Sequence, residues 1–176
     1  MIRASSSALL FACVAALAWP APSAATLSPI TARSKAIGEH VWNEPCWRWG
    51  GVHIRRDYID DGVDAHSRVV LGEATVDRDS NGDVVACRVT INKRFVFSPG
   101  ALCTIVVHEL GHLAGYRAPE GEQFVWYANG ARIDDYDHSR SRDSVMYPYM
   151  SGRDRPYSRC AQAFGDRYSW RMVGED

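Results

Sequence analysis

The sequence predicts an α+β fold, because one helical stretch is followed by three strand-like stretches and then by two more helical ones. Apolar residues recur every three or four positions in the helical stretches, whereas Val, Thr and Ile are concentrated in the strand-like ones. The expected helices cover residues 31–42, 101–116 and 158–172, and the expected strands cover residues 49–59, 68–77 and 84–92.

Residues 1–25 have the pattern of a secretory signal peptide. Arg3 gives this segment a basic start, residues 8–19 form a continuous apolar run, and Ser23-Ala24-Ala25 offers small residues for cleavage. The apolar run is too short to span a membrane. The alternative to a signal peptide is that this segment forms an ordinary N-terminal helix. We therefore expect a secreted, extracellular protein with one domain over residues 26–176, in which no repeat or linker is found.

The composition argues against several classes of function. The 176 residues are 46% apolar and 23% charged, and the formal net charge is -1. This balance is typical of a globular chain and not of a disordered one. Nucleic acids and anionic membranes attract basic segments, and the sequence has no basic block. We therefore expect neither of them as a partner.

The helices have recognisable start and stop signals. Pro45 follows the first helix and would end it. The helix over residues 101–116 is apolar on almost all sides, begins after Ser98-Pro99, and has a natural end at Gly115. Because it is apolar on almost all sides, the central helix should be packed under the sheet. Ser158 is a suitable cap for the last helix.

The second and third strands should form a hairpin. Between them lies DRDSNGD, whose Asn81-Gly82 pair is typical of tight turns. The acidic residues over 77–83 also have the oxygen spacing of a calcium-binding EF-hand loop. However, the twelfth position of such a loop is Arg88, where a bidentate Glu belongs, and strands flank the segment. We favour the hairpin, and Ca²⁺ is not favoured.

The central helix carries the pattern H-E-x-x-H, at His108, Glu109 and His112. A spacing of four places both imidazoles on one helix face, where they can bind the same zinc ion. Glu109 would then lie next to a zinc-bound water and accept its proton. Without a metal, two histidines and a glutamate in a buried helix would be costly. The pattern therefore indicates a Zn²⁺ site.

The chain resembles the metzincin clan of zinc peptidases, most closely its matrixin branch and the small secreted bacterial proteins related to it. In that family the helix motif continues to a glycine and a third histidine, and a tight turn with a methionine lies under the metal. The residues that match are His108, Glu109, His112, Gly115, His138 and Met146. Met146 follows His138 by eight residues, as in the family.

The sequence departs from the family at the third histidine. Three residues after Gly115 the chain has Ala118, and the matching His138 comes about twenty residues later, as if a loop had been inserted. The insertion, residues 117–136, contains several aromatic residues and a short stretch, 120–128, that we expect to be helical. It is either a lid over the cleft or a segment packed on the side of the domain.

The resemblance covers residues 68–150 and the last helix. It implies a twisted, mostly parallel sheet of four or five strands, a backing helix, the active-site helix and a C-terminal helix. It also implies that residues 71–76 form an antiparallel edge strand that binds extended substrate. Met146 would support the metal site without binding the metal, and Tyr147 and Tyr149 would line the cleft or stabilise the oxyanion.

The function that the resemblance implies is that of a secreted, monomeric zinc endopeptidase, with His108, His112 and His138 as metal ligands and Glu109 as the catalytic base. Its partner would be a protein or peptide substrate. A second hypothesis takes the third ligand from an acidic residue, for which Glu120, Glu122, Asp134 and Asp135 are available. A third is a non-catalytic binding protein with a structural zinc site, which would need four protein ligands.

Four cysteines remain after the signal segment, an even number that fits two disulfides in an exported protein. Cys87 ends the hairpin and Cys103 lies in the first turn of the central helix, so a bridge between them would fix the helix to the sheet. Cys46 would then pair with Cys160. All three connectivities remain open from the sequence alone.

Overall fold

The computed structural model describes residues 28–43, 46–59, 69–128, 131–148 and 155–174. The expected signal segment, 1–25, lies outside these ranges. The helices are α1 (Pro29–Val41), α2 (Pro99–Leu113), α3 (Ser158–Phe164) and the short 3-10 helix η1 (Trp47–Trp49). The strands are β1 (Val52–Asp57), β2 (Gly72–Arg78), β3 (Val84–Asn92), β4 (Phe95–Phe97), β5 (Gln123–Ala128), β6 (Ala131–Ser139) and β7 (Trp170–Met172). The protein thus has the expected α+β class.

Strands β1, β3 and β2 form a sheet in that order, with β1 parallel and β2 antiparallel to the central β3. The predicted hairpin is confirmed, and Asp79 forms its turn by accepting hydrogen bonds from the backbone N–H groups of Asn81 and Asp83. The antiparallel edge position of β2 is also confirmed. A mostly parallel sheet of four or five strands is not found among the described residues.

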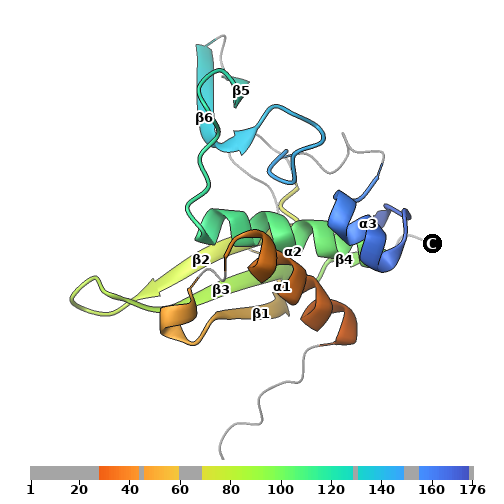
Figure 1. Ribbon diagram of the computed structural model, residues 1–176, viewed down its shortest axis with the longest axis horizontal. Coiled ribbons are helices and arrows are strands. Elements are labelled where there is room, and N and C mark those ends of the chain that lie inside the picture. The colour runs from red at the N-terminus through yellow and green to blue at the C-terminus, as the bar shows by residue number, and fades with distance from the viewer. Residues whose placement is uncertain (1–27, 44–45, 60–68, 129–130, 149–154, 175–176) are drawn as a thin grey trace, which may run out of the picture.

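Helix α2 lies over this sheet and forms the centre of the core (Figure 1). It begins as predicted at Ser98 and Pro99, although the Ser98 hydroxyl donates to the carbonyl of Arg167 and does not cap the helix. Ile105 and Val106 belong to the same buried cluster as Val89 and Ile91 of β3. Such burial on nearly every side explains why the helix is apolar all round.

Helix α1 packs against α2. Gly38 allows the close approach, because a Cβ atom there would collide with Leu110. At the end of α1, the indole N–H of Trp42 donates to the carbonyl of Val107 over 2.7 Å. The position of α2 is therefore fixed by both the sheet and α1.

No helix in the described ranges has the length and apolar character needed to cross a membrane.

The predicted helix over residues 120–128 is wrong. Residues 123–128 instead form β5, which pairs with β6 in an antiparallel hairpin that projects away from the sheet and helices (Figure 1). The segment is rich in Phe, Val, Trp and Tyr, which favour strands over helices. Gly121, with φ of 78°, also turns the chain just before β5. The insertion is therefore a β-hairpin.

The C-terminal helix is shorter than predicted. Helix α3 ends at Phe164, because Gly165 follows with a φ of 84° that favours glycine. Residues 170–172 then form β7, which pairs antiparallel with β4. The ring of Trp170 contacts that of Phe95 edge-on, with centroids 5.5 Å apart. This pairing and contact draw the chain end out of the helical path.

The predicted disulfide pairing is also wrong. The bridges join Cys46 to Cys87 and Cys103 to Cys160, with Cα atoms 6.2 and 5.7 Å apart. The first connects the segment before β1 to the centre of β3, and the second connects α2 to α3. Cys87 and Cys103 are both fully buried, but their bridges lead to different parts of the chain. The disulfide of α2 therefore joins this helix to α3 and not to the sheet.

Removing the Cys103–Cys160 bridge should lower the free energy of unfolding by about 4 kcal/mol, because the bridge closes a long loop in the unfolded chain. The two cysteines are 57 residues apart. The test compares denaturant unfolding of the wild type with that of a Cys103→Ala, Cys160→Ala variant. Peptide mapping without reduction should show the two bridges described here, and a Cys87–Cys103 peptide would contradict them.

Candidate metal centre

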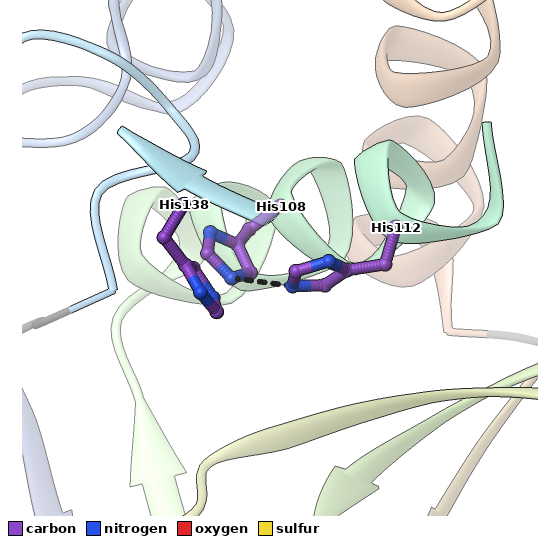
Figure 2. A group of neighbouring side chains, drawn as sticks. All are labelled: His108, His112 and His138. Atoms are coloured by element: carbon purple, nitrogen blue, oxygen red, sulfur yellow. Dashed lines mark hydrogen bonds between the residues drawn. The ribbon is translucent and has the colours of Figure 1, made fainter. Parts of the chain in front are cut away.

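Three histidines from distant parts of the chain converge on one point. His108 and His112 come from α2, and His138 comes from β6 (Figure 2). One ring nitrogen of each lies within 4.8 Å of the others, so that the three could hold a metal ion. All three side chains are partly buried. The structure thus brings together the three predicted ligands, including the one that follows the insertion.

The spacing of the two helix histidines is suited to a single metal ion. Their Nε2 atoms are 3.1 Å apart, and the rings meet edge-on (Figure 2). Two nitrogen ligands of a tetrahedral Zn²⁺ ion, each about 2.0–2.1 Å from the metal, lie roughly 3.4 Å apart. The ring of His138 stacks on that of His108, with centroids 5.2 Å apart. Small adjustments would therefore produce a three-histidine site.

Hydrogen bonds orient two of the imidazoles. His108 Nδ1 lies 2.9 Å from the carbonyl oxygen of Val145, and His138 Nδ1 lies 2.8 Å from a carboxylate oxygen of Asp135. A carbonyl oxygen and a carboxylate only accept, so each Nδ1 must carry the proton. The Nε2 lone pairs of both rings are then available to a metal ion. This is the tautomer that metal ligation through Nε2 requires.

A large bulge in β6 presents His138. Gln123 of β5 pairs with Ser139, but the next residue, Phe124, pairs with Asp135. Residues 136–138 therefore have no partner on β5. Bulges of this kind redirect side chains and are frequent next to functional sites. The backbone N–H of Ala118 donates to the carbonyl of Tyr136 over 2.8 Å, which ties the bulge to the chain that leaves α2.

Glu109 is buried beside the histidines. Its carboxyl group lies against Gly72 at the start of β2, where a Cβ atom would come within 2.8 Å of it. Burial, and secondarily the charge of Glu73, raises the pKa of Glu109 to about 8. A cation in the site would favour the ionised carboxylate and act in the opposite direction. The glycine therefore makes room for an ionisable group at the edge of the sheet.

His112 is held in its neutral form. Burial, and secondarily the charge of His138, lowers the pKa of His112 to about 4, although Asp137 and Asp135 oppose this shift. A metal ion binds the neutral imidazole and not the protonated one. At neutral pH the ring is thus already in the state that coordination requires.

Met146 packs against α2 at Gly111. It is fully buried, and any side chain at Gly111 would collide with its sulfur atom and come within 2.9 Å of Trp42. The neighbouring Val145 supplies the carbonyl that orients His108. The backbone N–H of Ser139 donates to the carbonyl of Met146, so that the turn is also joined to the end of β6. The turn is therefore hydrogen-bonded both to His108 of α2 and to Ser139 at the end of β6.

The other predicted residues have different surroundings. Asp134 pairs with Arg132, and Asp135 contacts His138. Glu120 and Glu122 are exposed in the turn before β5. Tyr147 contacts the ring of Phe124 edge-on, with centroids 5.7 Å apart, and Tyr149 lies outside the described ranges. The bulge in β6 has no recognisable sequence signal, so its role could not be predicted. From the sequence, Asp135 is a candidate only for the role of ligand.

No protein-family model matches the chain, and neither a curated protein nor a solved structure matches it.

Proposed function

We propose that the protein is a secreted zinc-dependent endopeptidase of the metzincin type. The observation that carries the proposal is the convergence of His108, His112 and His138, with Glu109 next to the first of them on the same helix. The two disulfides support export, because such bridges persist in oxidising compartments. The catalytic part of the proposal rests on the site alone.

The donor set favours zinc as the metal. Three neutral imidazole nitrogens are a known ligand set of catalytic zinc, which keeps its fourth position open. Two of the three histidines also have a hydrogen-bonded Nδ1, as is usual for zinc ligands. When bound, the ion would supply Lewis-acid activation of a water molecule and of the substrate carbonyl.

Within this proposal, Glu109 is the general base. Its carboxylate takes the proton from the attacking water and then donates it to the amine that leaves, so that one residue serves both steps. Its place against Gly72 puts it at the start of β2, the antiparallel edge strand of the sheet. An extended peptide that adds to this edge would bring a backbone carbonyl near Glu109 and the three histidines.

The two alternatives receive less support. An acidic third ligand is disfavoured because, within the described residues, the group able to hold a metal consists of histidines only. A structural zinc site is normally closed by four protein ligands, and this group provides three. Both hypotheses predict metal binding, so that metal content does not separate them from the proposal.

The proposal is tested by measuring hydrolysis of an unfolded protein, such as reduced casein, by the purified chain. Hydrolysis should be abolished by a chelator and restored by adding Zn²⁺. A chain that binds zinc stoichiometrically but cleaves no unfolded protein or peptide mixture would support the binding-protein alternative. A chain that cleaves equally well after chelation would contradict zinc catalysis altogether.

A further inference from the structure

The carboxylate of Asp135 is held at both of its oxygen atoms. Oδ2 lies 2.8 Å from Nδ1 of His138, and Oδ1 accepts a hydrogen bond of 3.0 Å from the backbone N–H of Asp137. The side chains of Asp135 and His138 are only 16% and 21% exposed. A carboxylate with two such bonds cannot rotate away without losing one of them. The orientation of the His138 ring is therefore coupled to a fixed group.

This contact exists only because β6 is interrupted. In a regular strand, residues three positions apart point to opposite faces of the sheet, so Asp135 and His138 would not meet. Residues 136–138 form a bulge without partners on β5. The bulge is held at its base by the bond from Ala118 to Tyr136 and by an ion pair between Arg117 and Asp137. The fold thus brings these two side chains together.

We propose that Asp135 is the positioning residue of the third metal ligand. It fixes the proton of His138 on Nδ1 and turns Nε2 toward the two histidines of α2. It does not itself belong to the group able to hold a metal. This inference rests on the proposed zinc function. It replaces the role of ligand, for which the sequence made Asp135 a candidate, with that of a hydrogen-bond acceptor behind the ligand.

The contact differs in kind from the one behind His108. There the acceptor is the backbone carbonyl of Val145, which no substitution of a side chain removes. Behind His138 the acceptor is an anionic side chain, which can be changed alone. Outer-shell partners of this kind hold the ring in place and raise its basicity, and their loss typically weakens metal binding about 10- to 100-fold. Asp135 is therefore the outer-shell contact that can be tested directly.

The experiment measures the zinc dissociation constant at one pH, by competition with a chromophoric chelator. Asp135→Ala should raise it about 10- to 100-fold. Asp135→Asn should give an intermediate zinc dissociation constant. The amide has a single oxygen, which can accept from one of the two donors, while its nitrogen would face the second donor. The matched controls are Asp134→Ala and Asp134→Asn, because Asp134 is the adjacent carboxylate and pairs with Arg132. Both controls should bind zinc as tightly as the wild type.

Several outcomes would overturn the inference. Wild-type affinity in both Asp135 variants would show that the contact does not position the ligand. An equal loss in the Asp134 controls would show a general effect of negative charge. Circular dichroism of the chelated proteins reports folding, and if Asp135→Ala does not fold, Asp135→Asn decides. A wild-type chain that binds no zinc would contradict the proposed function itself, which distinguishes that failure from a failure of this inference alone.

Discussion

Glu109→Gln should lower peptidase activity by roughly 100- to 10,000-fold while the zinc content stays at one ion per chain. The amide keeps the shape of the buried side chain but cannot accept the proton of the attacking water. All three histidines remain in place, so that metal binding should not change. The measurements are kcat/KM on a quenched fluorescent peptide and zinc content by atomic absorption.

Glu120→Gln is the matched control for this prediction, because Glu120 is an exposed glutamate in the turn before β5 and is not one of the residues able to hold a metal. It should have wild-type activity. Full activity in the zinc-loaded Glu109→Gln variant would contradict the assignment of the general base. Loss of zinc together with activity would show instead that Glu109 holds the helix in position.

His138→Ala should weaken zinc binding by more than the loss of an outer-shell partner does, that is by more than about 100-fold. Two helix histidines then remain, and they do not complete the ligand set of a catalytic zinc site. His53→Ala is the control, because His53 is exposed on β1, outside the metal-binding group. The zinc dissociation constant from chelator competition is the measurement.

Unchanged zinc affinity in His138→Ala would reassign the third ligand. If Asp134→Ala or Asp135→Ala then abolished binding in the presence of His138, the acidic alternative would be correct. If every one of these variants bound zinc normally, the site would lie elsewhere in the chain.

Local patterns in the sequence were sufficient to predict the helix and the hairpin near the site. The turn at Asn81-Gly82 fixed the hairpin of β2 and β3, and the apolar stretch with Ser98-Pro99 before it indicated α2. The spacing of His108 and His112 on one helix followed from helix geometry alone. Each of these predictions depends on residues close in sequence.

The errors come from contacts between residues far apart. Helical spacing after Ser158 continued past Gly165, but residues 170–172 pair with β4, which is distant in the sequence, and are not helical. Likewise, Cys87 and Cys103 are close in sequence but have partners 41 and 57 residues away. Gly165 was a usable stop signal that the periodicity outweighed. No comparable signal marks the disulfide partners.

The third histidine is an intermediate case. Its distance from Met146 placed it correctly in the group, although about twenty residues separate it from the position of the family pattern. The means by which the chain delivers it, a bulge in a strand, could not be foreseen, because strand register depends on the partner strand. The predicted helix over residues 120–128 is a different kind of error, because the Phe, Val, Trp and Tyr residues of this segment favour a strand.

The chain that leaves α2 and the chain that returns to His138 are joined at a narrow neck. Ala118 and Tyr136 are linked there by a backbone hydrogen bond, and Arg117 and Asp137 by an ion pair. These contacts hold the two ends of the outer hairpin close together, beside the strand segment that carries His138. Doubling the length of a flexible connection costs only about 0.6 kcal/mol. The outer hairpin is thus a place where foreign sequence can be grafted without redesigning the metal centre, provided that Phe124 and Asp135 are kept.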